Sequence, residues 1–310
     1  MNSAAVVMHE PGRLELSLLP LTAPVAGDVV VEMIASGIST GTEKLLYEGR
    51  MPMFPGMGYP LVPGYESVGR ISATRGDLRE GQLVFVPGAK CFDGVRSLFG
   101  GTAQRLVVPA SRVTPIDDAL GERGVLLALA ATAYHAVAPE FTTPDLIIGH
   151  GVLGRLLARI IIAQGHPAPI VWEINPNRAE GGDGYEVLHP EDDTQRHYRC
   201  ICDASGDSDL LDRLVARLAP GGEIVLAGFY SERLSFAFAP AFMKEARLRI
   251  AAQFLDRDVL AVRRLVETGD LSFDHLITHR ADPRAADTAY RTAFNDPGCL
   301  KMILDWSHCA

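Results

Sequence analysis

The sequence predicts a fold class of α/β plus β, in which a small antiparallel β-barrel is joined to a doubly wound parallel sheet. Three observations predict it. The first third consists of short β-branched segments between turn residues, residues 145–268 alternate strand and helix patterns, and a glycine-rich loop follows the first of those strands. With 310 residues, the chain also has the length of about two domains.

The composition excludes several classes of protein. A hydrophobic content of 47% with 22% charged residues excludes a chain that is mainly disordered. A net charge of −9 argues against nucleic-acid binding. The best apolar run, residues 125–138, is shorter than the ~18 residues of a membrane span. The first residues lack the basic start of a secretory signal. Five cysteines without a C-x-x-C pair predict no disulfide framework and a reducing, cytoplasmic compartment.

The order of the predicted elements places the domain boundaries. We expect one domain from residues 1–120 and 275–310, and a second from residues 121–274. Expected strands of the first domain are 28–32, 69–71, 81–86, 105–109 and 301–305, with a helix at 285–294. Expected strands of the second are 145–149, 169–173, 199–203 and 223–227, with helices at 121–138, 153–164, 208–218 and 258–268. The strand at 301–305 should rejoin the N-terminal β region.

The loop Gly149-His-Gly-Val-Leu-Gly154 has the spacing G-x-G-x-x-G between a predicted strand and a predicted helix. This is the dinucleotide-binding pattern of a Rossmann fold, in which the glycines allow a tight turn and close approach of a pyrophosphate. Glu173 ends the next strand, where it can bind a ribose diol and repel a 2′-phosphate, so NAD is favoured. Arg178 and Asn175 keep NADP open. The predicted cofactor-binding residues are Gly149, His150, Gly151, Val152, Leu153, Gly154, Glu173, Arg178 and Ser205.

The whole chain resembles the medium-chain dehydrogenase/reductase family, in which a GroES-like β-barrel catalytic domain surrounds a Rossmann domain in the sequence. Four segments carry the resemblance: residues 35–43 (ASGISTGTE), 63–69 (PGYESVG), 149–154 and 301–304 (KMIL). It implies an NAD-dependent alcohol dehydrogenase and, at family level, a homodimer.

Zinc-binding members of that family have Gly-Ile-Cys-Gly-Thr-Asp and Gly-His-Glu in the first two segments, and the cysteine and histidine bind the catalytic metal. Here Ser39, or Thr40 if the loop is one residue longer, replaces the cysteine, and Tyr65 replaces the histidine. Hydroxyls and a neutral phenol are poor zinc ligands, and the four-cysteine lobe of the structural zinc is absent. We therefore predict no metal.

Without zinc, side chains must accept the proton of the alcohol. The resemblance assigns Tyr65 as proton acceptor or hydrogen-bond partner, Thr42 and Ser39 as relay, and Glu66 as a carboxylate behind the site. A phenol pKa of about 10 is too high for a base at pH 7, so Lys44 is expected to lower it if it points inward. Simpler roles are packing for Tyr65, a helix N-cap pair for Thr42 and Glu43, and a structural salt bridge for Glu66.

Residues 37–43 and 54–69 resemble one zinc-free branch of the family, which acts on bacteriochlorophyllides. This implies NAD-dependent oxidation of a 3-(1-hydroxyethyl) group to 3-acetyl in bacteriochlorophyll a biosynthesis. The loop 51–59 is rich in methionine and aromatic residues, which suit a broad, flat tetrapyrrole, although it could pack on the barrel or form a dimer contact instead. The substrate-binding residues predicted there are Met53, Phe54, Met57 and Tyr59.

Two other functions stay open from the sequence. One is a zinc-free, NADPH-dependent reductase of quinones or enoyl groups with the same fold, against which Glu173 and residues 54–69 argue. The other is a non-catalytic pigment or cofactor carrier, which would not need an intact glycine loop and a full set of hydroxyl and carboxyl groups.

Overall fold

The computed structural model describes residues 1–53, 55–74 and 78–309. The chain divides into two compact units, one of residues 1–128 with 273–310 and one of residues 129–272. The boundaries expected from the sequence lie at 120/121 and 274/275. Each unit has its own buried apolar core.

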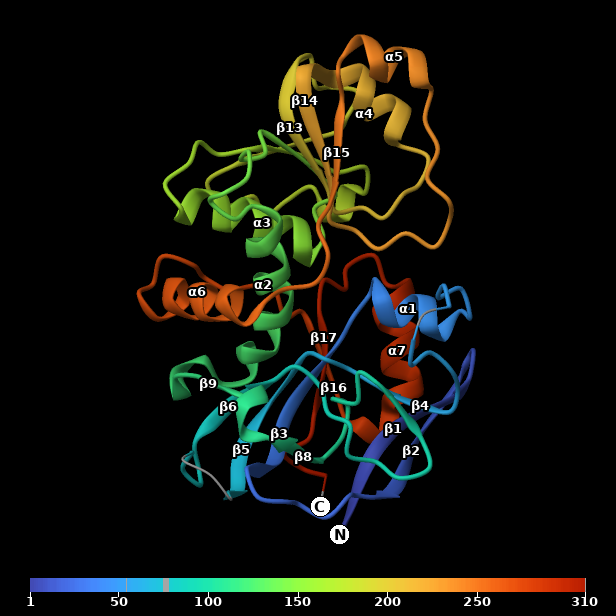
Figure 1. The fold of residues 1–310 in the computed structure, drawn as a ribbon, viewed down its shortest axis with the longest axis vertical. Coiled ribbons are helices and arrows are strands. Elements are labelled where there is room, and N and C mark those ends of the chain that lie inside the picture. Colours follow the sequence, from blue (N-terminus) through green and yellow to red (C-terminus); the bar gives the residue numbers. More distant parts are fainter. Residues whose placement is uncertain (54, 75–77, 310) are drawn as a thin grey trace. The chain divides into compact units, whose positions relative to one another are not determined.

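The first unit is a β structure with short helices, as Figure 1 shows in its lower part. Among its described residues, one sheet has the order β2-β1-β4-β7 and a larger one the order β16-β17-β3-β5-β6-β9, with β8 also paired to β3. The elements are β1 (Asn2–Glu10), β2 (Arg13–Pro20), β3 (Asp28–Ile38), α1 (Thr42–Tyr47), β4 (Leu61–Pro63), β5 (Ser67–Thr74), β6 (Leu83–Val86), β7 (Arg96–Leu98), β8 (Arg105–Pro109), η1 (Ala110–Arg112), β9 (Thr114–Pro115), η2 (Asp118–Leu126), β16 (His279–Ala281), η4 (Pro283–Ala285), α7 (Ala286–Asn295) and β17 (Met302–Asp305).

Strand β3 is central to this unit because it pairs with β5, β8 and β17. Its β-branched start, Val29 to Val31, is buried, as expected for a strand covered on both faces. Strand β17 runs antiparallel to the end of β3, with Met302 opposite Ile38, and Figure 1 shows the red strand beside the blue one. The prediction that the C-terminal strand rejoins the N-terminal β region is confirmed.

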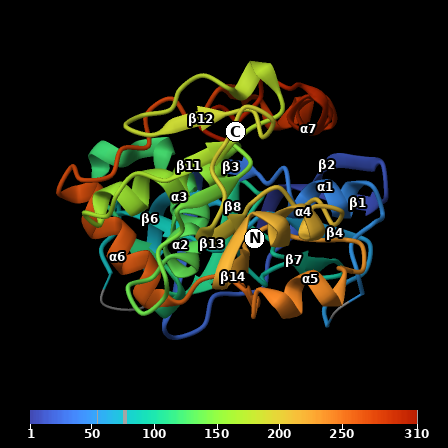
Figure 2. The ribbon, with the colours of Figure 1, turned by 90° about the horizontal axis from the view of Figure 1, so that it is seen from above.

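The second unit is a parallel sheet with helices on both sides. Its strands, all in described residues, have the order β12-β11-β10-β13-β14-β15, and every neighbouring pair is parallel. In Figure 2, α3 and α4 lie on opposite sides of β13 and β14. The elements are α2 (Leu127–Ala136), which begins just before the unit, β10 (Leu146–Ile148), α3 (Val152–Ala163), β11 (Ile170–Trp172), η3 (Pro176–Arg178), β12 (Glu186–Leu188), β13 (Tyr198–Asp203), α4 (Leu211–Arg217), β14 (Leu218–Leu226), α5 (Phe238–Met243), β15 (Arg247–Ile250) and α6 (Asp256–Glu267).

This strand order reverses direction between β10 and β13, the topological switch point at which Rossmann folds bind dinucleotides. The glycine-rich loop follows β10 and leads into α3 at this switch point. The predicted combination of a β-barrel with a Rossmann unit is confirmed.

The helix expected over residues 121–138 is shorter than predicted. A 3₁₀ helix, η2, covers Asp118–Leu126, and the α-helix begins only at Leu127. Gly121 lies inside η2 with a positive φ of 49°, which breaks a continuous helix. Strands β12 and β15, of three and four residues, were not predicted. In the described part of the chain, no helix is both long and apolar enough to cross a membrane.

Candidate functional site

In the first unit, a hydroxyl pair lies between the end of β3 and the loop after β4. The Tyr65 hydroxyl is 3.1 Å from Ser39 Oγ, and either can donate. Ser39 is buried, whereas Tyr65 is partly exposed and packs edge-on against Phe99, with ring centroids 5.3 Å apart. The structure therefore brings together two of the predicted catalytic residues, although 26 residues separate them in the sequence.

The electrostatic surroundings keep Tyr65 protonated at neutral pH. Burial and the charge of Glu66 raise its pKa above the ordinary value, and hydrogen bonds with Ser39 and Thr42 oppose that rise only in part. Lys44 would lower this pKa only if it pointed inward, and that condition is not met, since its Nζ lies 3.4 Å from the carbonyl oxygen of Phe294 and 3.9 Å from Glu48. Tyr65 is a neutral phenol that shares a hydrogen bond, not a resident base.

Thr42 is the first residue of α1 and is partly exposed. The residue in the N-cap position is Gly41, and no side chain caps this helix end. The simpler role of Thr42 as a helix cap is therefore wrong, which leaves its hydroxyl available to Tyr65.

Glu66 is buried behind the hydroxyl pair and forms an ion pair with Lys301. Glu66 Oε2 lies 2.6 Å from Lys301 Nζ, and the same ammonium donates to the carbonyl oxygen of Ile38 at 3.1 Å. Gly37 is required here, because a Cβ at this position would lie 2.5 Å from Glu66 Oε2. Both proposed roles of Glu66 are thus compatible with its position, and the sequence reasoning missed its partner Lys301.

A second buried carboxyl group, Glu43, was also missed as a site residue. It lies on α1, and its Oε2 accepts a hydrogen bond of 2.6 Å from the hydroxyl of Tyr290 on α7. Its Oε1 accepts a weaker bond of 3.4 Å from the backbone N–H of Ser39. Burial raises the pKa of Glu43 to about 8, and the charge of Glu66 contributes to this rise. No spacing in the sequence relates Glu43 to Tyr290, which is 247 residues away.

In the second unit, the glycine loop has the backbone shape that the motif predicts. Gly149 has a positive φ of 94°. A Cβ on Gly154 would collide with the carbonyl oxygen of Gly149, so the third glycine allows the helix to pack on the turn. At Gly151 there is open space instead, because the nearest atom to an added Cβ would be a guanidinium nitrogen of Arg178, 4.0 Å away. A dinucleotide pyrophosphate fits a loop of this kind.

Two further predicted cofactor residues, Val152 and Leu153, form the first turn of α3. Val152 is buried and Leu153 is partly exposed. Their backbone N–H groups belong to the helix N-terminus, where unpaired donors favour an anion.

Glu173 lies directly after β11, and its carboxylate is held by backbone N–H groups. Its Oε2 accepts from His150 at 2.9 Å, and its Oε1 accepts from Ile174 at 2.8 Å and Asn175 at 2.7 Å. These bonds fix the negative charge beside the glycine loop.

His150 is fully buried. Its Nδ1 lies 2.6 Å from the carbonyl oxygen of Arg178, so Nδ1 carries the proton and donates. Its Nε2, 2.8 Å from the Tyr185 hydroxyl, then accepts from that phenol. Burial lowers the pKa of His150 to about 4, so the ring is neutral at pH 7.

Arg155 joins the same network and was not predicted. From α3 it donates to the carbonyl oxygens of His150 (3.1 Å), Gly181 (3.0 Å) and Glu180 (2.8 Å). The turn 179–184 is therefore held against the glycine loop.

Ser205 follows β13 and lies next to the glycine loop, since its Cα would be 3.5 Å from a Cβ on Gly149. Its backbone N–H and its hydroxyl both donate to Asp203 Oδ1, at 2.8 and 2.6 Å. The Tyr230 hydroxyl donates to the other oxygen of Asp203 at 2.8 Å. The predicted cofactor residues of the second unit thus gather at the carboxyl end of the sheet.

The predicted pigment loop has a mixed outcome. Met53 is 82% exposed and accessible to a ligand, whereas Phe54 lies outside the described residues. Met57 is only 7% exposed because it packs into the apolar core. The Tyr59 hydroxyl donates to the carbonyl oxygen of Leu46 at 2.5 Å. Met57 and Tyr59 therefore have structural contacts within the barrel unit, as the alternative of self-packing predicts.

The donor chemistry of the first unit does not favour zinc. Ser39, Thr40 and Tyr65 offer only oxygen atoms of hydroxyl type. Across the described residues, no group of three or more His, Cys, Asp or Glu side chains is arranged to hold a metal ion.

Comparison with known proteins agrees with this architecture. Residues 25–118 match the family model of the alcohol dehydrogenase GroES-like domain. The fold is similar to a short chain alcohol dehydrogenase from E. coli CFT073 complexed with NADH (TM-score 0.83, 22% identity, 98% and 99% of the two chains). It is also similar to L-idonate 5-dehydrogenase from E. coli K-12 (TM-score 0.86, 18% identity, 98% of both chains).

Two curated relatives are much more similar in sequence. The 2-desacetyl-2-hydroxyethyl bacteriochlorophyllide A dehydrogenase of Rhodobacter capsulatus is 57% identical over 99% of both chains. The protein of the same name from Cereibacter sphaeroides is 56% identical over 99% of both chains. The chain belongs to the medium-chain dehydrogenase/reductase family. Within that family its place is with these two bacteriochlorophyllide dehydrogenases, as the resemblance of residues 37–43 and 54–69 indicated.

Proposed function

We propose that this protein oxidises the 3-(1-hydroxyethyl) group of a bacteriochlorophyllide to a 3-acetyl group in bacteriochlorophyll a biosynthesis. The observation that carries the proposal is the 57% identity, over 99% of both chains, to the R. capsulatus dehydrogenase of that substrate class. The reductase and carrier alternatives have no comparable support. In the reaction, the carbinol carbon loses a hydride to the nicotinamide and the hydroxyl loses a proton.

The two units divide this work. The barrel unit carries the hydroxyl and carboxyl cluster and is the catalytic and substrate domain. The parallel-sheet unit carries the glycine loop and is the nucleotide domain. This division follows from the chemistry of the side chains that each unit holds.

The cofactor is NAD, which accepts a hydride when bound. The open backbone at Gly151 would receive the pyrophosphate, close to the guanidinium of Arg178. The carboxylate of Glu173, fixed by three N–H groups, would accept a ribose hydroxyl and repel a 2′-phosphate. Binding of NAD and NADP by wild type and Glu173→Gln tests this. The variant should lose most of the preference for NAD, and equal binding of both cofactors by wild type would contradict the assignment.

The proton is handled by hydroxyl groups without zinc. Tyr65 would hydrogen-bond the substrate hydroxyl, Ser39 and Thr42 would exchange protons with Tyr65, and the proton that the substrate loses would leave to solvent through the partly exposed Thr42. Glu66 and Lys301 form a buried charge pair behind these groups. Exposed Met53 would contact the pigment face, where a polarizable side chain suits an aromatic macrocycle.

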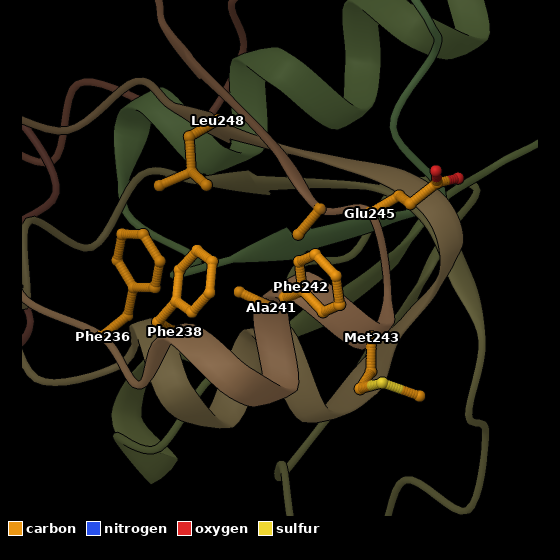
Figure 3. A pocket seen from close by; sticks show the side chains of 8 residues that line it. Phe236, Phe238, Ala241, Phe242, Met243, Glu245 and Leu248 are labelled. Carbon is orange, nitrogen blue, oxygen red and sulfur yellow. The ribbon is translucent and has the colours of Figure 1, made fainter.

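The protein also has an apolar surface suited to a homodimer. A shallow groove of about 550 Å³ lies between α5 and β15, and Figure 3 shows Phe238 and Phe242 along it. Within residues 129–272, β15 is the last strand of the sheet, so its outer edge has unpaired backbone groups. A second copy related by a two-fold axis could pair with this edge and cover the apolar side chains. The large apolar side chains exposed on α5 and β15 are Phe238, Phe242, Met243, Leu248 and Ile250.

Sedimentation velocity tests the dimer. Wild type should sediment as a dimer at micromolar concentration, and Ile250→Asp should sediment as a monomer. The control is Leu260→Ser, which replaces an equally apolar side chain, 50% exposed, on α6 and should stay dimeric. A monomeric wild type would rule the dimer out.

A cytoplasmic location remains part of the proposal. Cys91, Cys200 and Cys202 are buried, and burial raises the pKa of each thiol. Cys200 and Cys202 share one strand, as predicted, and both are inaccessible. Thiols in this state suit a reducing compartment.

The decisive experiment uses purified protein with 3-(1-hydroxyethyl) bacteriochlorophyllide and NAD. We expect NADH to form together with the red-shifted pigment absorption of an acetyl chlorin. The same incubation with NADP should be much slower. A protein that binds NAD but leaves the pigment spectrum unchanged would contradict the proposed function.

A further inference from the structure

Glu43 is a buried carboxyl group that the proposed proton path leaves unused. It is 1% exposed, and Tyr290, which donates to its Oε2 at 2.6 Å, is fully buried. A buried carboxylate is costly unless hydrogen bonds or a cation compensate it. Burying the Glu43 side chain in its charged form therefore costs free energy of folding.

The groups facing Glu43 come from several elements. Tyr290 on α7 donates to it, the backbone of Ser39 donates from the end of β3, Glu66 repels it from the loop after β4, and Lys301 attracts it from before β17. The ammonium of Lys301 is hydrogen-bonded to Glu66 and to the backbone of Ile38. Of the two buried carboxyls, Glu66 thus has the cation in direct contact, and Glu43 has a phenol and an amide. Burial raises the pKa of Glu43 to about 8.

Ser39 connects Glu43 to the hydroxyl pair. Its backbone N–H donates to Glu43 Oε1 at 3.4 Å, and its hydroxyl lies 3.1 Å from that of Tyr65. The negative charge of Glu43 also raises the pKa of Tyr65, which means that it raises the affinity of that phenol for a proton. A change at Glu43 therefore reaches Tyr65 through the backbone of Ser39 and through the electric field.

We propose that Glu43 is a positioning residue for the Ser39–Tyr65 pair, held in place by Tyr290, and that its negative charge favours the oxidation step, in which the Tyr65 hydroxyl takes the substrate proton and releases its own proton through the partly exposed Thr42 to solvent. The carboxylate strengthens the hydrogen bond from Ser39 when it is charged. It does not touch the substrate. The inference rests on the proposed function, because it assigns the pH dependence of that oxidation to one side chain.

The first test is the pH profile of single-turnover hydride transfer. For wild type we expect the rate to rise through a midpoint near pH 8. Glutamine in Glu43→Gln has the shape of glutamate but cannot ionise. The rate of this variant should therefore stay at the low-pH level of wild type at every pH. The hydrogen bond from Tyr290 stabilises the charged form of Glu43 and therefore lowers the pKa of this carboxyl. Tyr290→Phe removes that bond, so the midpoint of the rate profile should rise by about one to two pH units. The proposal would be overturned if the rate of Glu43→Gln still rose through a midpoint near pH 8, or if the midpoint of Tyr290→Phe were the same as that of wild type.

The second test needs no substrate. Infrared difference spectra of the folded protein between pH 6 and 10 should show one protonated carboxyl band that disappears near pH 8 and is missing in Glu43→Gln. If the band is seen and the pigment is not oxidised, the proposed function fails while the assignment of Glu43 as a buried acid stands. If wild type oxidises the pigment and no such band titrates, the inference about Glu43 fails alone.

Discussion

The ammonium of Lys301 lies 2.6 Å from Glu66 Oε2, and neither side chain is more than 1% exposed. The two residues are 235 positions apart in the sequence. The ion pair joins the segment that precedes β17 to the loop after β4, so a single contact ties the C-terminal strand to the candidate catalytic cluster. The effect of this ion pair on the free energy of unfolding is seen when one partner is removed.

Replacing Lys301 by Met should destabilise the protein strongly. Glu66 would stay buried without its cation, and loss of one partner of a buried pair costs about 3–5 kcal/mol. Urea denaturation at pH 7 measures this free energy of unfolding. The matched control is Arg13→Met, because the Arg13–Glu10 pair is exposed on both sides and should change stability by less than about 1 kcal/mol.

The double variant Lys301→Met/Glu66→Leu provides the complementary outcome. With both charges removed, no buried charge is left unpaired, so most of the lost stability should return. A double variant as unstable as Lys301→Met would show that packing, not the unpaired carboxylate, causes the loss.

Tyr65→Phe should slow single-turnover hydride transfer by about 10²-fold or more, the usual contribution of a positioned acid or base. The ring and its packing on Phe99 are retained, so only the bonds of the hydroxyl are lost. Tyr47→Phe serves as the control, since Tyr47 lies at the end of α1 and packs against Phe294 instead of Phe99. An unchanged rate across the pH range in Tyr65→Phe would remove this residue from the mechanism.

Two glycines of the 149–154 loop should respond differently to alanine. Gly154→Ala forces a Cβ onto the carbonyl oxygen of Gly149, so the protein should express poorly or unfold at lower temperature. Gly151→Ala points into open space and should fold normally, but a methyl group there should weaken NAD binding by obstructing the pyrophosphate. Thermal melting and NAD titration separate the two effects. Full NAD affinity in Gly151→Ala would place the cofactor elsewhere.

His150 should make the nucleotide domain sensitive to acid. Its pKa is lowered by burial from an ordinary 6.5 to about 4, so the folded state prefers the neutral ring. The stability that this preference contributes is present above pH 6.5 and is lost as the pH falls through 4. His150→Asn should flatten the stability profile in that window. An NMR titration of the His150 ring with a midpoint above pH 6 would contradict the burial argument.

The sequence was a good guide wherever a pattern is local. The glycine loop, the position of Glu173 after a strand and the C-terminal strand all follow from neighbouring residues, and the structure has them at the expected places. The helix over 121–138 was overextended because apolar periodicity does not reveal the turn at Gly121. Strand β15 was missed because Arg alternates with Leu and Ile over only four residues.

The contacts of the site were harder to predict. Lys44 directly follows the segment 35–43 but faces Phe294 and Glu48, whereas the cation paired with Glu66 is Lys301 from the far end of the chain. Methionine is a residue type that suits a ligand contact, but the side chain of Met57 packs into the apolar core instead. Sequence spacing carries no information on such pairings.

The sequence by itself determined that this is a two-domain dehydrogenase with a nicotinamide-binding fold. It also predicts a site without zinc, because residue identity alone removes the thiolate and imidazole that zinc requires. Only the tertiary structure decided which groups surround the hydroxyls that stand in their place. Burial sets the proton affinities of Glu43, Tyr65 and His150, and burial is a property of the packed fold. The partners Tyr290 and Lys301 reach Glu43 and Glu66 only because α7 and β17 fold back onto the first strands.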